Sequence, residues 1–468
     1  MTRSAQAAGQ GMDKTSSRIV DFAISARDAS FSASAVDACK RSLVDTFACA
    51  LGAFDTPLAH KARHTAGRYK GGQPAAQVWG CDWTASVEMA AYANGVMLRL
   101  LDLSDAYRKK CGGHPSDVVA AIAAAADACN SSGAEVIAAT IAAYEIYCAC
   151  CDAVDLNALG WDQPVYGVVA SAMGAGMLFG LDREQMGQAL SLALAPNLAL
   201  LQTRRGSLSS WKNCAGANAA RNGVFAVLLA REGYTGPEEV FEGPHGLFEI
   251  TGAFDWDLPS IASESNRIAR VNFKSFPLCY HGQAAAWAAQ RLFGVVRPDQ
   301  IESIDVATYQ QSFNEMASES LKWAPRTAET ADHSLPFVVA TMLVYGDVDR
   351  DSFNDARLDD AVLAGLMRKT RVTVDPALSD GYPQSAPCRL SVRLASGDRF
   401  DVRIDSAKGH ADNPMDFGDL RTKFGKLTAG RCEASRVAGF CRAIGALEHA
   451  PSFRETVGTW RHLESTIY

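Results

Sequence analysis

Apolar residues recur at spacings of three and four along most of residues 32–270. The period is clear in "SAVDACKRSLVDTFACALGAF", "VEMAAYANGVMLRLLD", "VVAAIAAAADACN" and "AEVIAATIAAYEIYCACC", and it is typical of helices that bury one face. Small side chains dominate these segments, so the helices can approach one another closely. The pattern predicts a helical bundle, with a capping box at Asp182 and Gln185. Gly233 is expected to end the helix in "SSWKNCAGANAARNGVFAVLLAREG".

The pattern changes after Asn272. "IESIDVATYQ" alternates apolar and polar residues like a strand, and "CRLSVRLASGDRFDVRID" has two alternating runs around a turn at Ser396 and Gly397. The helical period returns from about Asp416. We therefore expect a mainly α protein, with a large all-helical domain built from residues 1–271 and 406–468 and a smaller α/β domain from residues 272–405.

Two uncharged segments, residues 163–181 and 185–203, are long enough to cross a membrane. The first contains Pro164 and four glycines, the second contains Pro196, and neither has a basic flank, so we interpret both as buried core helices. The N-terminal stretch "MTRSAQAAGQGMDKTSSR" lacks the apolar core of a secretory signal. We expect a cytoplasmic protein without a membrane partner, whose thirteen cysteines are reduced.

Composition and motifs exclude several classes of ligand and of catalytic site. A net charge of -7 without a basic block argues against nucleic acid as a partner. No Walker loop or GxSxG elbow is present, and "GAGMLFG" misses the dinucleotide spacing. His60 and His64 have helical ligand spacing without an HExxH motif, and Cys148, Cys150 and Cys151 match no iron–sulfur run. The sequence therefore predicts no metal and no cofactor.

Polar residues interrupt the apolar sequence in four places. Histidines and carboxylates can move protons near neutral pH, and lysines and arginines can hold carboxylates and stabilise developing charge. This inventory suits proton abstraction beside a carboxylate, as in dehydration, decarboxylation or epimerisation. The residues are Asp102, Asp105, Tyr107 and His114; Arg204, Arg205 and Lys212; Lys274 and His281; and Asp332 with His333.

Five segments resemble the signature segments of the 2-methylcitrate dehydratase (MmgE/PrpD) family and occur in that family's order. They are "LDLSDAYRKKCGGHPSD", "QTRRGSLSSWKNCAGANAARNGVFAVLLAREGYTGPEEVFEGPHGLFE", "KSFPLCYHGQAAA", "RTAETADHSLPFVVATMLVYGDV" and "KGHADNPM". The resemblance implies a helical domain built from both chain ends, a smaller α/β lid, a site in the cleft between them, and a homodimer. It also implies a lyase of propionate catabolism that needs no cofactor.

The resemblance implies roles for individual residues. Asp102, His114, Lys212, Lys274 and His281 are expected to be catalytic, with His114 handling a proton after orientation by Asp102 or Asp105, and His281 assisting the leaving hydroxyl or a second proton. Lys212, Lys274 and Arg204 are expected to hold carboxylates. The expected substrate-binding residues are Asp105, Tyr107, Arg204, Arg205 and His333.

The expected reaction is dehydration of 2-methylcitrate or a similar citrate-like polycarboxylate to the corresponding aconitate. Decarboxylation or isomerisation of an aconitate-like acid stays open, as does a non-catalytic polycarboxylate-binding protein. The chain departs from the dehydratase pattern at Ala106, where the family has threonine, and at Cys111, where glutamate is usual. Loss of a hydroxyl and a carboxylate affects which acid fits.

Overall fold

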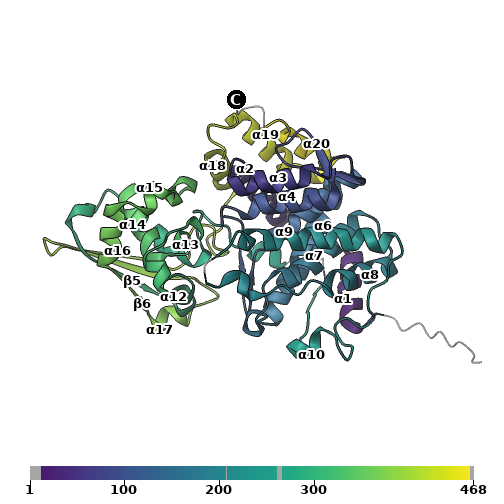
Figure 1. Ribbon diagram of the computed structural model, residues 1–468, viewed down its shortest axis with the longest axis horizontal. Helices are drawn as coiled ribbons and strands as arrows, with labels where there is room; N and C mark the ends of the chain where they lie inside the picture. Colours follow the sequence, from purple (N-terminus) through teal and green to yellow (C-terminus); the bar gives the residue numbers. More distant parts are fainter. Residues whose placement is uncertain (1–11, 207, 261–265, 464–468) are drawn as a thin grey trace, which may run out of the picture.

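Two separate clusters of buried apolar side chains organise the protein. The computed structural model describes residues 12–206, 208–260 and 266–463. One cluster draws on residues 19–273 and 415–463, the other on residues 276–404. Figure 1 shows the two resulting lobes, here called the body and the lid, with the C-terminal helices packed beside the N-terminal ones in the body. The mainly α fold, with a body built from both chain ends, is confirmed, while the domain limits 1–271, 272–405 and 406–468 stay a prediction.

Helices make up almost all of the body, as the apolar period predicts. The predicted capping box joins Asp182 and Gln185, and Gly233 follows the last helical turn with a φ of 83°. Small residues allow close crossings, because a Cβ on Gly95 would lie 2.8 Å from the Cβ of Ala217 on the neighbouring helix. The body helices are α1 (Lys14–Ser25), α2 (Ala33–Gly52), α3 (Pro57–Gly67), α4 (Val87–Arg99), α5 (Val119–Cys129), α6 (Gly133–Ala153), α7 (Pro164–Leu178), α8 (Arg183–Leu194), α9 (Trp211–Arg231), α10 (Leu247–Thr251), α18 (Phe417–Leu427), α19 (Ala434–Gly445) and α20 (Phe453–Val457).

One described helix, α6, is long and apolar enough to cross a membrane by length and composition. Its most apolar window is 89% buried inside the protein, as expected for a core helix. The two segments 163–181 and 185–203 form α7 and α8 with the turns that follow them, and their apolar residues belong to the body core. Residues 1–11 of the N-terminal stretch lie outside the described residues.

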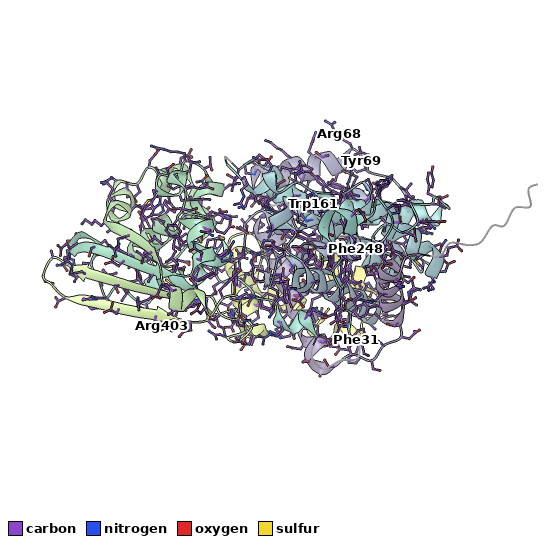
Figure 2. The ribbon with its side chains drawn as sticks, turned by 90° about the horizontal axis from the view of Figure 1, so that it is seen from below. Phe31, Arg68, Tyr69, Trp161, Phe248 and Arg403 are labelled. Atoms are coloured by element: carbon purple, nitrogen blue, oxygen red, sulfur yellow. The ribbon has the colours of Figure 1, made fainter. Side chains whose placement is uncertain are left out.

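A four-stranded sheet forms one layer of the lid. Its order is β6 (Thr370–Val374), β5 (Ile301–Thr308), β7 (Cys388–Leu394) and β8 (Arg399–Ile404), with β5 and β6 parallel and the other pairs antiparallel. The predicted strand and hairpin are confirmed: Leu390 faces Val402 and Val392 faces Phe400 across β7 and β8. Arg403 lies on the outer strand β8 (Figure 2).

Helices complete the lid on the buried side of this sheet, where α11 contacts β7 and β8, α16 contacts β5, and α14 contacts β6. This placement agrees with the alternation along β5, in which Ile304 and Val306 are buried while Glu302 and Asp305 are exposed. The lid helices are α11 (Gln283–Gln290), α12 (Gln310–Met316), α13 (Ala328–Ala331), α14 (Leu335–Tyr345), α15 (Asp355–Leu358), α16 (Ala361–Lys369) and α17 (Pro376–Ser379).

Two short hairpins belong to the body. β1 (Ala75–Gln77) pairs with β2 (Thr84–Ser86), and β3 (Tyr107–Arg108) pairs with β4 (Gly112–Gly113). The second hairpin lies in the polar segment that follows α4, and its Arg108 lies over the ring of Tyr280 in the lid.

Candidate active site

A cavity of about 380 Å³ is lined by residues of both lobes. Its described lining holds nine lysines and arginines but five aspartates and glutamates. The cavity is therefore locally positive although the whole chain carries a net charge of -7. Such a concave positive site suits a small polyanion.

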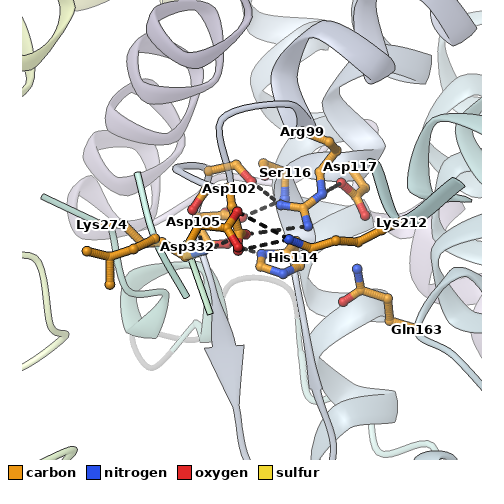
Figure 3. A network of polar contacts seen from close by, with 12 residues as sticks. Arg99, Asp102, Asp105, His114, Ser116, Asp117, Gln163, Lys212, Lys274 and Asp332 are labelled. Carbon is orange, nitrogen blue, oxygen red and sulfur yellow. Dashed lines mark hydrogen bonds and ion pairs between the residues drawn. The ribbon is translucent and has the colours of Figure 1, made fainter. Parts of the chain in front are cut away.

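Asp102 lies at the centre of the polar network (Figure 3). Helix α4 ends at Arg99, and Asp102 follows with a φ of 44°, which is unusual for a residue other than glycine. The ammonium of Lys274 donates to the Asp102 carbonyl at 2.6 Å and to its Oδ1 at 2.8 Å. Burial opposes ionisation of Asp102, but Lys274, Lys212 and His333 hold the pKa of this carboxyl well below its usual value. Asp102 is therefore an anion that anchors cations.

His114 is arranged as a proton acceptor. Its Nδ1 lies 2.6 Å from the main-chain carbonyl of Asp105, and because a carbonyl only accepts, the proton of the neutral ring is on Nδ1. The lone pair of Nε2 is then free, on a ring that lines the cavity. Burial, together with the charges of Arg99 and Lys274, lowers the pKa of His114 well below its usual value. The ring is therefore neutral at neutral pH, with a lone pair that can accept a proton.

Asp105 and Tyr107 are not part of the described lining of the cavity. The Asp105 carboxylate accepts from the Ser116 main-chain N–H and the Tyr144 hydroxyl, both at 3.0 Å, and burial raises its pKa to about 6. The Tyr107 hydroxyl donates to Asp152 at 3.0 Å. The structure thus gives these two side chains partners in the body, and it is the Asp105 carbonyl, not a carboxylate, that lies beside His114 Nδ1.

Lys212, Asp332 and His333 bring together the first turn of α9 and the segment before α14. The Lys212 ammonium lies 3.4 Å from Asp332 Oδ2 and 3.4 Å from His333 Nδ1, which is also hydrogen-bonded to Asp332 Oδ1. Burial and Lys212 disfavour the imidazolium, but Cys279 and Asp332 outweigh them and raise the pKa of His333 to about 9. His333 is therefore protonated at neutral pH, opposite in state to His114.

Asp102, Asp332 and His333 also form a group that could hold a metal ion, because their ligand atoms lie within 4.8 Å of one another. The Lys212 ammonium occupies the same place: it is 3.7 Å from Asp102 Oδ2 and 3.4 Å from Asp332 Oδ2. A metal ligand must also be deprotonated, whereas His333 binds a proton. These donors match a lysine better than a divalent cation.

The other predicted residues also line the cavity. His281 is buried, its Nδ1 lies 2.6 Å from the Tyr309 hydroxyl, and burial and Arg108 lower its pKa well below the usual value. Arg204 donates to Asp162 and to the Lys212 carbonyl, both at 3.0 Å, so it holds the start of α9. Arg205 is exposed at the rim.

The structure adds residues that sequence reasoning missed. Arg99 is buried 3.3 Å from Asp117, and its position inside the apolar run "VMLRLLD" was the available signal. Arg108 and Gln163 line the body wall of the cavity and Tyr382 lines the lid wall. Only Arg108 lies in a polar segment that the sequence marks, and the other two have no such signal.

The two departures from the dehydratase pattern occupy different environments. Ala106 is buried in an apolar cluster with the lid residues Tyr280 and Tyr309, and its main chain exchanges hydrogen bonds of 2.8 Å with Asn272. Cys111 lines the cavity, and its sulfur lies 3.6 Å from the Tyr166 hydroxyl. Burial raises the pKa of the Cys111 thiol, so it is not a reactive thiolate.

The fold combines a helical body with an α/β lid, and residues of both line a cavity that contains His114, His281 and His333. Residues 17–257 match the model of the MmgE/PrpD N-terminal domain, and residues 276–447 match that of the MmgE/PrpD C-terminal domain. The chain belongs to the MmgE/PrpD family, and it is a lyase.

Similar proteins include a 2-methylcitrate dehydratase of Cupriavidus necator, 27% identical over 80% of this chain and 82% of the relative. A 2-methylcitrate dehydratase of Escherichia coli is 26% identical over 82% of this chain and 83% of the relative. A cis-aconitate decarboxylase of Mus musculus is 26% identical over 82% of this chain and 80% of the relative. Relatives with two different lyase reactions thus match nearly the same length of chain.

Proposed function

We propose that this protein is a hydro-lyase that dehydrates 2-methylcitrate or a similar citrate-like polycarboxylate to the corresponding aconitate. The observation that carries the proposal is the pairing of a neutral His114 with a protonated His333 in one positively charged cavity. Two titratable groups whose pKa values are pushed apart are suited to act as base and acid.

In the proposed reaction, Nε2 of His114 removes a proton from a carbon next to a substrate carboxylate. The electron pair of that C–H bond forms the new double bond as the C–O bond of the neighbouring hydroxyl breaks. His333 gives its proton to the departing hydroxide, and water leaves. Asp332 keeps His333 charged before the reaction through the hydrogen bond at Nδ1.

The lysines stabilise the charge that builds up during this reaction. Negative charge moves onto the substrate carboxylate when the carbon loses its proton, and the ammonium groups of Lys212 and Lys274 line the same cavity. Asp102 holds both of them in place before substrate binds, so little reorganisation is needed at the moment of reaction.

We assign the leaving hydroxyl to His333 rather than to His281. The lowered pKa of His281 leaves it neutral, and a neutral imidazole is a weaker acid than the imidazolium of His333. With the Tyr309 hydroxyl as donor to Nδ1, the ring of His281 carries its proton on Nε2 and can donate a hydrogen bond to a substrate carboxylate.

A panel of candidate acids tests the proposal. The purified protein is incubated with 2-methylcitrate, citrate, cis-aconitate and trans-aconitate, and products are identified by mass spectrometry. Loss or gain of water supports the hydro-lyase. Tight binding of these acids without any turnover would contradict it and favour a polycarboxylate-binding protein.

Decarboxylation is the second candidate, because the mouse relative is named cis-aconitate decarboxylase. The same cations could hold a carboxylate whose loss as carbon dioxide leaves a carbanion for His333 to protonate. Loss of carbon dioxide from cis-aconitate in the panel would favour this reaction, and a change of structure without a change of mass would favour isomerisation. We further propose a cytoplasmic homodimer, which size-exclusion chromatography with light scattering and cell fractionation can test.

A further inference from the structure

Arg108 lies on the wall of the cavity where the body meets the lid. It belongs to β3, and its guanidinium carbon is 5.6 Å from the centre of the Tyr280 ring of the lid. A Cβ on Gly112 of the paired strand β4 would lie 1.9 Å from Arg108 Nη1. The guanidinium therefore packs against Gly112, where any side chain would collide with it. The β3–β4 hairpin thus fixes the position of the guanidinium in the cavity.

The charge of Arg108 has no counter-ion among residues 12–206, 208–260 and 266–463. Of the other cations that line the cavity, Arg99, Arg204, Lys212 and Lys274 have a carboxylate within 4.0 Å, while no such contact is found among the described residues for Lys109, Lys110, Arg205 and Lys322. Nε of Arg108 is buried and has no hydrogen-bond partner. Arg108 is the cavity-lining cation of the described chain that combines both features.

Arg108 is half-buried, its buried Nε lacks a hydrogen-bond partner and its charge lacks a counter-ion among the described residues, so the cation is incompletely stabilised. A ligand carboxylate can supply both, since the planar guanidinium presents paired N–H donors that match two carboxylate oxygens. The lysines beside Asp102 lie on other elements, at the start of α9 and of the lid, and we therefore expect Arg108 to contact a different carboxylate of the ligand.

We propose that Arg108 binds a carboxylate of the substrate that takes no part in bond breaking, and that the enzyme thereby selects tricarboxylates over dicarboxylates. This inference rests on the proposed function, because that function places the reacting carbons near His114 and His333.

Unreactive acids test the inference without turnover. Affinities for tricarballylate, which has three carboxylates, and for glutarate, which has two, are measured by isothermal titration calorimetry. The proteins are wild type, Arg108→Gln, Arg108→Lys and the control Arg68→Gln, whose site is exposed at the end of α3 outside the cavity (Figure 2). Thermal melting establishes that each variant is folded.

Wild type and Arg68→Gln are expected to prefer tricarballylate by about ten- to hundredfold, the contribution of a hydrogen-bonded charge pair. Arg108→Gln should lose most of that preference while its affinity for glutarate changes little. Arg108→Lys should keep part of it, because it retains the charge without the paired donors. If Arg108→Gln kept the preference for tricarballylate, or lost affinity equally for both acids, the role of Arg108 would be overturned. The proposed function would still stand. A wild-type protein that binds neither acid would overturn the proposed function and this inference with it.

Discussion

At the scale of single residues, His114 carries the largest share of the proposed chemistry. Replacing it with alanine removes the base, and loss of a positioned general base commonly lowers the rate about a hundred- to ten-thousandfold. We expect kcat of His114→Ala to fall by that factor with little change in melting temperature. His449→Ala, at an exposed histidine outside the cavity, is the matched control. Full turnover by His114→Ala would contradict the assignment.

The two histidines also predict the pH dependence of the reaction. Activity needs His114 without its proton, so it falls when acid protonates a group whose pKa lies well below the usual value. It needs His333 with its proton, so it falls as pH rises through about 9. We expect kcat/KM to show a plateau around neutral pH with a limb on each side.

Asp332→Asn tests whether His333 is the group responsible for the alkaline limb of this pH profile. The Asp332 carboxylate raises the pKa of His333, so its removal should move the alkaline limb to lower pH and leave the acid limb in place. Asp359→Asn, at an exposed carboxylate of the lid, should change neither limb. An alkaline limb that stays in place in Asp332→Asn would rule out His333 as the acid.

The same residues predict how the enzyme responds to removal of metal ions. The ammonium of Lys212 lies among the oxygens of Asp102 and Asp332, where a divalent ion would have to bind. We expect the rate to be unchanged after dialysis against a strong chelator. A loss of activity that added metal restores would show that an ion displaces the lysine.

At the scale of elements, one buried ion pair joins the two ends of the chain. Lys423 on α18 lies 2.5 Å from Asp45 on α2, and its ammonium also donates to the Leu103 carbonyl at 3.1 Å. Leu103 directly follows Asp102, so the pair connects the C-terminal helices to the loop that carries the network. Both side chains are buried.

Lys423→Met is expected to reduce the free energy of unfolding by about 3–5 kcal/mol, because it leaves a buried carboxylate without its counter-ion. Burial raises the pKa of Asp45 and Lys423 lowers it, so the variant should raise it further. A carboxyl with a raised pKa in the folded state favours folding below its unfolded pKa, and this stability is lost as pH rises through the folded value. The defect should therefore shrink in acid.

Equilibrium urea unfolding at neutral and acid pH measures this effect. Arg421→Met, on the exposed face of the same helix, is the control and should stay near wild type. Equal stabilities of the two variants at neutral pH would show that the buried pair contributes nothing measurable.

The elements differ in how far the sequence predicts them. Helices such as α2 and α6 and the hairpin β7–β8 bury one face over many residues, so their periods are visible. Strand β6 was not predicted, because its five residues become a strand through parallel pairing with β5, far away in the sequence. Local pattern carries no information on such a pairing.

The candidate site shows the same division. Polar residues in apolar surroundings marked His114, Lys212, Lys274, His281 and His333, and all of them line one cavity. The directions of Asp105 and Tyr107 depend on Ser116, Tyr144 and Asp152. Those contacts form only in the folded body, so composition and spacing could not reveal them.

At the scale of the whole molecule, the two lobes are joined by two chain crossings that run side by side. The Phe273 N–H donates to the Gly409 carbonyl at 2.8 Å, and the Ser275 hydroxyl donates to the Lys408 carbonyl at 2.9 Å. Lys274 lies between these two hydrogen bonds in the sequence. The crossings therefore set both the placement of the lid and the position of a lysine in the network.

Gly409→Ala tests this coupling between architecture and catalysis. Gly409 has a φ of 98°, and a Cβ there would lie 2.3 Å from the Phe273 carbonyl oxygen, so the crossings must move apart. Gly397, in the β7–β8 turn, has a φ of 94° with no atom within 4 Å of such a Cβ. Each of the two substitutions, Gly409→Ala and Gly397→Ala, should lower the free energy of unfolding by about 1–2 kcal/mol through backbone strain.

Only Gly409→Ala should also lower kcat, because Lys274 would shift relative to Asp102. Rates and melting temperatures of the two variants, measured together, separate strain from displacement. Equal activity in both, with comparable loss of stability, would mean that the network tolerates movement of the crossings, and that the lid is held in place by its other contacts with the body, such as the apolar cluster of Ala106 with Tyr280 and Tyr309.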